Sequence, residues 1–62
     1  MAAKFEIYKD KSGEFRWRLV HTNGQVIANS GEGYKAKANV MGGINSVKEN
    51  ALNATTVEDT TA

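Results

Sequence analysis

Few side chains in this 62-residue sequence are of types that perform acid–base or nucleophilic chemistry, and none has an evident partner. The single histidine, His21, would need a group within hydrogen-bonding reach to act as a general base, so a partly exposed structural role is the simpler interpretation. Serine, threonine and lysine nucleophiles also lack an activating neighbour. The available carboxylates fall mostly in turns, on strand exteriors or in the tail, at Glu6, Asp10, Glu14, Glu32, Glu49, Glu58 and Asp59. We therefore predict no catalytic residues and a protein that is not an enzyme.

The composition also argues against metal and cofactor chemistry. The chain contains no cysteine, which removes disulfides and thiolate zinc sites. One histidine is too few for an imidazole-rich metal site. We expect neither a metal nor a cofactor.

A glycine motif, Gly31-x-Gly33-x-x-Ala36, matches a relaxed form of the dinucleotide fingerprint, in which glycines let a phosphate approach a helix N-terminus. That fingerprint belongs to a parallel β-α-β unit, whereas this sequence predicts antiparallel strands, so we reject dinucleotide binding. A softer anion-binding hypothesis survives, because two lysines in the first turn of the predicted helix oppose the helix dipole. Solvated surface lysines are the simpler alternative. The hypothetical anion site comprises Gly31, Gly33, Lys35 and Lys37.

Arg16 and Arg18 flank Trp17, with Tyr8 nearby, and basic residues beside aromatic ones can signal stacking on nucleic acid. The predicted strand register instead places Glu6 opposite Arg18 and Tyr8 opposite Arg16, as ordinary cross-strand pairs. Trp17 faces the other side of the sheet, and the net charge of only +1 supplies no basic stripe. Nucleic-acid binding is thus disfavoured. The alternative function for this protein is a weak nucleic-acid or anion-binding module that uses Arg16, Arg18, Lys35 and Lys37.

The first predicted strand covers residues 4–9, which alternate polar and apolar side chains. The Asp-Lys-Ser-Gly sequence that follows predicts a three-residue hairpin loop ending at a left-handed Gly13. This loop length pairs Phe5 with Leu19. Other loop lengths would place the apolar residues opposite arginines. A change of one residue in the strand register would turn all the apolar side chains of one strand to the wrong face of the sheet.

Two further alternating runs are joined at an Asn-Gly pair (residues 23–24), the strongest short-range hairpin signal. A two-residue loop there places Leu19 opposite Ala28 and His21 opposite Val26. One face of the resulting meander is apolar and holds Phe5, Ile7, Phe15, Trp17, Leu19, Val26 and Ala28. The other face is mixed and holds Glu6, Tyr8, Arg16, Arg18, Val20, Ile27 and Asn29.

A helix is predicted from about residue 34 to residue 50, where apolar residues recur every three or four positions. Its apolar stripe would cover the apolar face of the sheet, since neither element can bury that side alone. Two glycines at residues 42–43 conflict with the helix, because each costs roughly 1 kcal/mol relative to alanine. We interpret them as a close approach of the helix to the ring of Trp17 or Phe15; a break into two short helices is the alternative.

The predicted fold class is therefore α+β: a three-stranded antiparallel β-meander packed against one C-terminal α-helix. The β-β-β-α domain covers residues 1–51, and residues 52–62 form a threonine- and acid-rich tail. Within the tail, residues 55–58 have the composition of a short fourth strand at the sheet edge, and an irregular tail is the alternative.

Several motifs, in order, resemble the YegP-like family of small bacterial and archaeal domains. They are Phe-Glu-Ile-Tyr-Lys-Asp (5–10), Gly-Glu-Phe-Arg-Trp-Arg-Leu (13–19), Asn-Gly-Gln-Val-Ile-Ala (23–28), Gly-Tyr with Lys-Ala (33–38) and Gly-Ile-Asn-Ser-Val-Lys (43–48). The resemblance implies a β-β-β-α unit, present singly or as two tandem copies, with single-copy members forming homodimers. It implies no biochemical activity. Lys35 stands where the family places a small hydroxyl residue that caps the helix, which leaves Gly33 or Tyr34 as a weaker cap.

A chain of this size buries only about 60% of the surface that its unfolded form exposes, so it needs additional stabilisation. With disulfides and metals excluded, oligomerisation remains. The mixed face has the composition of an interface, although scattered exposed aliphatics are the alternative, and the strand edges offer a second route. We predict a homodimerising interaction or structural module whose interface uses Tyr8, Arg16, Arg18, Val20 and Ile27.

Nothing in the sequence has the length and hydrophobicity of a signal peptide or a membrane span. We therefore expect a cytoplasmic protein that associates with a second copy of itself and not with a membrane.

Overall fold

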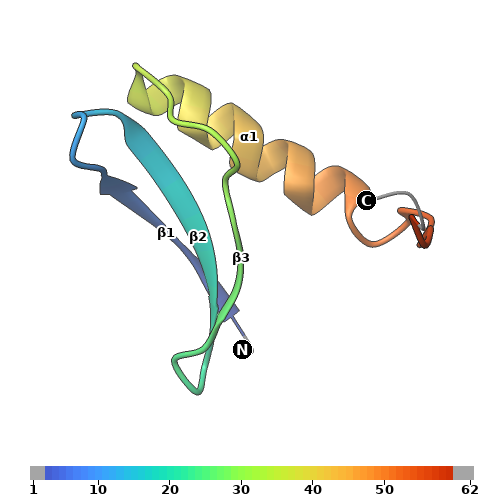
Figure 1. Ribbon diagram of the computed structural model, residues 1–62. Helices are drawn as coiled ribbons and strands as arrows, with labels where there is room; N and C mark the ends of the chain where they lie inside the picture. Colours follow the sequence, from blue (N-terminus) through green and yellow to red (C-terminus); the bar gives the residue numbers. More distant parts are fainter. Residues whose placement is uncertain (1–2, 60–62) are drawn as a thin grey trace.

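The computed structural model describes residues 3–59 and shows three antiparallel strands followed by one helix (Figure 1). The strands are β1 (Ala3–Lys9), β2 (Phe15–His21) and β3 (Val26–Asn29), and they form a meander with β2 in the centre. The helix, α1 (Lys37–Asn50), packs on one face of this sheet. The predicted β-β-β-α fold is confirmed. The outer limits of the predicted domain and tail, residues 1–2 and 60–62, lie outside the described residues.

The first hairpin has the predicted loop and register. The Asp10 N–H donates to the Glu14 carbonyl (2.9 Å), and the Gly13 N–H donates to the Asp10 carbonyl (3.0 Å). Gly13 has a φ of 86°, the left-handed conformation that a three-residue loop requires at this position. Phe5 lies opposite Leu19, so the first two strands present their apolar residues to the helix.

The second hairpin differs from the prediction. His21 donates its N–H to the Gln25 carbonyl (2.8 Å) and accepts the Gly24 N–H (2.9 Å), so the loop has three residues (22–24) instead of two. A two-residue type I′ turn needs a positive φ at both central residues, whereas here only Gly24 is left-handed, with a φ of 90°. The Asn23 side chain instead accepts the Gln25 N–H (2.9 Å), which stabilises the longer loop.

The longer loop moves Val26 to the other face of the sheet. Val26 lies opposite Val20 instead of His21, and a bulge between this pair and the next restores the predicted pairing of Leu19 with Ala28. Ile27 is the extra residue of the bulge and has no partner in the register. We call the sheet face that points away from α1 the outer face; it gains Val26, which the sequence had placed on the apolar face.

The helix begins later than predicted. Tyr34 is still extended, and its backbone exchanges two hydrogen bonds with Phe15 (2.7 and 2.8 Å), so the linker continues the sheet before the helix starts. Ala36 is the N-cap and makes no side-chain hydrogen bond. The cap prediction of Gly33 or Tyr34 is therefore wrong, because pairing with β2 holds this segment extended.

The glycine pair does not break the helix. A Cβ atom at Gly43 would lie 2.8 Å from the Tyr34 hydroxyl and 3.4 Å from Trp17 Nε1, whereas one at Gly42 would meet nothing within 4 Å. The predicted close approach to Trp17 is confirmed at Gly43. The Tyr34 contact was not predicted.

The core is small and lies between the sheet, chiefly β2, and the inner side of α1. Trp17, Val40 and Ile44 are buried, and the Phe5 ring meets the Trp17 ring edge-on, with ring centres 5.5 Å apart. Buried Ser30 ties the linker to the same strand, because its hydroxyl accepts the Trp17 N–H (3.3 Å). Partly buried apolar residues complete the core: Phe5, Ile7, Phe15, Leu19, Tyr34 and Val47.

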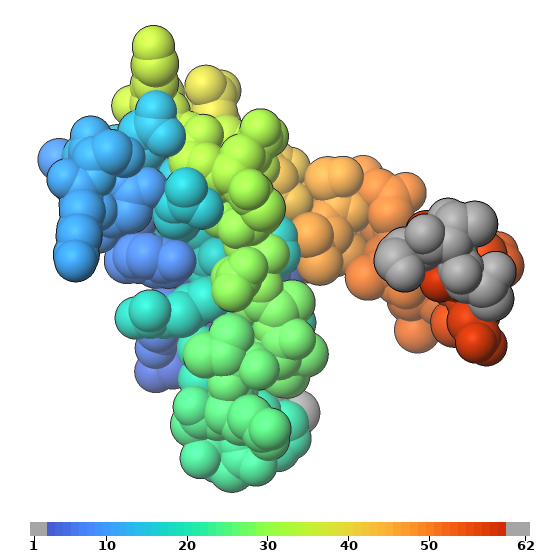
Figure 2. Space-filling model, in the orientation of Figure 1, coloured from blue at the N-terminus to red at the C-terminus, as the bar shows by residue number. Residues whose placement is uncertain are grey.

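The described part of the tail is irregular, so the short fourth strand considered for residues 55–58 does not form within this one chain. Figures 1 and 2 show the tail projecting from the C-terminal end of α1, away from the sheet. Two large apolar side chains are exposed there, Leu52 at 90% and Val57 at 78%.

Candidate functional site

The outer face brings together four of the five predicted interface residues. Alternate positions on β1 and β2 pair Lys4 with Val20, Glu6 with Arg18, and Tyr8 with Arg16. The fifth predicted residue, Ile27, lies in the bulge, and Val26 takes the place opposite Val20. The sequence missed Val26 because its face depends on the loop length of the second hairpin.

The charges on this face are largely paired. Arg18 donates from Nε to Glu6 (2.8 Å), and Lys4 Nζ lies 3.3 Å from the other oxygen of the same carboxylate. The hydrogen bond from Arg18, followed by that from Lys4, lowers the pKa of Glu6. The Arg18 guanidinium also lies 4.5 Å from the centre of the Tyr8 ring. Arg18 thus covers one face of the Tyr8 ring, where a nucleic-acid base would otherwise be able to stack, which weakens the nucleic-acid alternative.

Asp10 binds Arg16 at the opposite end of the sheet. Arg16 donates from Nε to Asp10 Oδ2 (2.6 Å), while Asp10 Oδ1 accepts from the Ser12 hydroxyl, the Ser12 N–H and the Glu14 N–H. These bonds, with that from Arg16 first, hold the pKa of Asp10 far below its ordinary value, and Asp10 in turn raises the pKa of Arg16. The network organises the first hairpin loop, so Arg16 is engaged in holding the fold.

The lowered pKa of Asp10 predicts a loss of stability in acid. A carboxyl group whose pKa is depressed in the folded state contributes stability above its unfolded pKa of about 3.9, and this contribution disappears as the pH falls toward the folded value. Replacing Asp10 with asparagine should therefore lower the melting temperature at pH 7, and the difference from wild type should shrink steadily below about pH 4.

Thermal melts at pH 7, 4, 3 and 2, followed by circular dichroism, measure this difference. Glu32→Gln, at an exposed carboxylate in the linker, is the matched control and should change the melting temperature little at any of these pH values. A difference between wild type and Asp10→Asn that stayed constant from pH 7 to pH 2 would contradict the proposed role of the Asp10 carboxylate.

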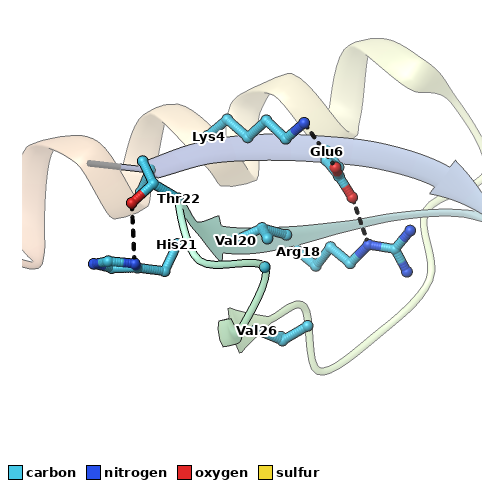
Figure 3. A pocket seen from close by; sticks show the side chains of 9 residues that line it. Lys4, Glu6, Arg18, Val20, His21, Thr22 and Val26 are labelled. Atoms are coloured by element: carbon cyan, nitrogen blue, oxygen red, sulfur yellow. Dashed lines mark hydrogen bonds and ion pairs between the residues drawn. The ribbon is translucent and has the colours of Figure 1, made fainter. Parts of the chain in front are cut away.

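The outer face is hollowed beside the second hairpin (Figure 3). This outer-face hollow has a volume of about 620 Å³, with Val20 and Val26 as its apolar floor and with Lys4, Glu6 and Arg18 along its rim. Of its lining residues, the sequence singled out Arg18 and Val20 as candidates.

His21 stands at the end of the hollow but has no catalytic partner among its contacts. Its Nδ1 accepts the Asn23 N–H (3.2 Å) and lies 3.3 Å from the Thr22 hydroxyl. An accepting Nδ1 places the proton of the neutral ring on Nε2. These local bonds secure the hairpin turn and support the structural interpretation of His21.

The structure disfavours an anion at the predicted glycine site. Lys37 is the first residue of α1, but Lys35 precedes the N-cap and lies outside the first helical turn. Glu14 packs against Gly33 so closely that a Cβ atom there would overlap its carboxylate. A carboxylate therefore already lies beside the glycine that would have to admit the anion.

A second hollow lies between the sheet and the helix. This helix–sheet wedge has a volume of about 520 Å³ and is open to the outside. Lys48 lies at its mouth, with Nζ 5.8 Å from the centre of the Phe5 ring. The helical stripe could have indicated the wedge, since it runs on to Ala51 beyond the small core. The apolar residues that line the wedge are Ala3, Phe5, Ile7, Leu19, Met41 and Ile44.

Within residues 3–59, no group of three or more histidine, aspartate or glutamate side chains is arranged to hold a metal ion. Over the same residues, the one helix is too short and too polar to span a membrane.

Fold and surfaces together define a small α+β domain with hollows on both faces of its sheet and no catalytic set among the described residues. The chain belongs to the family described as "Domain of unknown function (DUF1508)", whose model matches residues 10–58. The resemblance to the YegP-like family is confirmed, because these are the same family. The family description assigns no function and indicates no enzymatic activity.

Relatives match nearly the whole chain. A UPF0339 protein of Treponema denticola is 59% identical, over 94% of this chain and 98% of that protein. A UPF0339 protein in the ptx operon 5′ region of Stutzerimonas stutzeri is 57% identical over 82% of this chain, but the match covers only 45% of that protein. The solution NMR structure of a protein from Haloferax volcanii has a TM-score of 0.90 and 48% identity, over 94% of this chain and 97% of that one.

Proposed function

We propose that this chain is a homodimeric interaction module in which the tail of each copy packs into the helix–sheet wedge of the other. The observation that carries the proposal is a mismatch within one chain: an apolar hollow beside the core is open, while Leu52 and Val57 of the tail are exposed. Burying a side chain such as valine contributes about 1.5–3 kcal/mol. A second copy lets both surfaces be buried at once.

The chemistry of the tail suits the wedge. Val57 is apolar like the wedge lining, and Glu58, which follows it, is opposite in charge to Lys48 at the mouth. β1 is an edge strand of the sheet, and its free edge can accept a further strand. Residues 55–58 have the composition of a strand but find no edge within their own chain, and pairing with β1 of a second copy would supply one.

The length of one relative supports a pairwise arrangement. The match to the Stutzerimonas stutzeri protein leaves more than half of that protein uncovered, which is enough chain for a second copy of this unit. A dimer through the outer face, with Tyr8, Arg16, Arg18, Val20 and Ile27, is less favoured. Its arginines are paired within the chain and Val20 is already buried there.

Sedimentation equilibrium at micromolar concentration tests the proposal. The full chain should have twice its chain mass of 6.7 kDa. Val57→Asp should weaken the dimer by at least on the order of 100-fold, because two such contacts are lost in a symmetric dimer. The expected result for Val57→Asp at the same concentration is the mass of one chain.

Thr56→Asp is the matched control. It introduces the same charge and the same loss of strand propensity at the neighbouring position, whose side chain would face away from the wedge. It should leave most of the protein dimeric. A wild-type mass of 6.7 kDa at micromolar concentration would refute the dimer, and equal weakening by the two substitutions would refute the docking of Val57 in the wedge.

A further inference from the structure

We propose that the outer-face hollow binds a small organic anion with an apolar body, of the class of aromatic or branched aliphatic carboxylates. The hollow combines an apolar floor with a rim whose charges sum to +1. Its volume of about 620 Å³ falls within the range of roughly 300–1,000 Å³ that is common for small-molecule sites.

The floor suits the apolar body of such a ligand. Val20 is only 9% exposed and forms the base, while Val26 is 50% exposed and stands beside it. The bulge in the second hairpin creates this pair, because it turns Val26 onto the outer face opposite Val20. Bulges are enriched beside binding sites for this reason, since they redirect a side chain.

The rim suits a carboxylate. Lys4 and Arg18 both contact the single carboxylate of Glu6, so two positive charges are balanced by one negative charge. Arg18 uses Nε for this pair, and Figure 3 shows its two terminal nitrogens beyond Nε, at the end of the side chain that lies away from Val20. These nitrogens can donate to a ligand carboxylate, and the stacking of Arg18 on Tyr8 holds the guanidinium in place beforehand.

The same features discriminate against other ligand classes. An organic cation would be repelled by Lys4 and Arg18, and a small anion without an apolar body would leave Val26 exposed. A nucleic acid would need several unpaired cations and an open aromatic face, whereas this rim has a net charge of +1 and Arg18 covers Tyr8.

This inference does not depend on the proposed dimer. The outer-face hollow and the helix–sheet wedge open on opposite faces of the sheet. Val20 and Arg18 line the first, Phe5 and Leu19 line the second, and Ala3 and Lys4 at the start of β1 line both. The Val57→Asp variant should therefore retain the site even where it loses the dimer, so failure of one proposal is separable from failure of the other.

The test is a titration of the ¹⁵N-labelled full chain with three probes, followed by amide chemical shifts. Benzoate carries the charge and the ring, acetate carries only the charge, and benzylammonium carries the ring with the opposite charge. Benzoate should shift the amides of residues 18–26 with a Kd of about 1 mM, as expected for a ligand of nine heavy atoms. Acetate and benzylammonium should bind at least about tenfold more weakly.

Three variants complete the test. Arg18→Gln and Lys4→Gln should each weaken benzoate binding, Arg18→Gln by about tenfold or more, because each removes a charged donor. Lys48→Gln, at the wedge on the other face, should bind benzoate like wild type. If Arg18→Gln loses its dispersed spectrum, Lys4→Gln decides the result together with the position of the shifted amides. The Lys4 side chain is 71% exposed, so its replacement should not disturb the fold, but it also lines the wedge.

Three results would overturn the proposal. They are equal binding of benzylammonium and benzoate, benzoate shifts that map to the wedge, and benzoate affinity that neither Arg18→Gln nor Lys4→Gln reduces.

Discussion

Replacing Trp17 with alanine is expected to abolish cooperative folding of this chain at 25 °C. Trp17 lies on the central strand, is 7% exposed and packs with Val40 and Ile44 of the helix and edge-on against Phe5. Truncating a buried tryptophan to alanine costs about 3–5 kcal/mol. A core of this size supplies a net stability of about the same magnitude. Far-UV circular dichroism, followed through a thermal melt at fixed protein concentration, measures the loss.

Two controls separate this core effect from a general sensitivity to substitution. Trp17→Phe keeps an aromatic ring in the same place and should retain a cooperative transition at a lower melting temperature. Ile27→Ala removes a side chain that is 54% exposed in the bulge and should change the free energy of unfolding by less than about 0.5 kcal/mol. A sharp transition near the wild-type temperature for Trp17→Ala would show that the core is organised differently.

The same substitution at two adjacent glycines is expected to have opposite effects. Gly42→Ala should raise the free energy of unfolding by about 1 kcal/mol, because alanine is the better helix former and its methyl group would meet nothing within 4 Å. Gly43→Ala gains the same propensity but places its methyl group against Trp17 and the Tyr34 hydroxyl. Overpacking of this kind costs about 1–3 kcal/mol, so the two variants should differ by that amount.

Urea denaturation at one protein concentration measures both variants. Combining Gly43→Ala with Tyr34→Phe removes the nearest oxygen and should recover part of the loss, which a double-mutant cycle reports as a coupling between Gly43 and Tyr34. Equal stabilisation by alanine at both glycines would contradict the close packing of the helix at Gly43.

Local chemistry was sufficient to predict the first hairpin and the fold class. The Asp-Lys-Ser-Gly loop has one position that needs a left-handed glycine, and only one register keeps Phe5 and Leu19 on the same apolar face. The three- and four-residue spacing of apolar residues likewise predicted the helix, and the conflict at Gly43 indicated its close approach to Trp17. In each case, the signal that allowed the prediction comes from residues that are close in the sequence.

The second hairpin shows where local signals are insufficient. An Asn-Gly pair is compatible with a two-residue loop or with the end of a three-residue loop, and the two differ in which face receives Val26. Pairing along the whole of β2 decides between them, since the bulge at Ile27 restores the register of Leu19 with Ala28. The outer-face hollow depends on that outcome, so the sequence alone did not reveal it.

The sequence by itself determined the strands, the helix and the apolar face that joins them, because alternation, turn residues and helical spacing are local properties of the chain. Only the tertiary structure decided which side chains meet in space. It extended the linker at Tyr34 through backbone bonds to Phe15, paired Arg16 with Asp10, and left the wedge open and Val57 exposed. These outcomes depend on contacts between segments that lie far apart in the sequence, and no local pattern encodes such contacts.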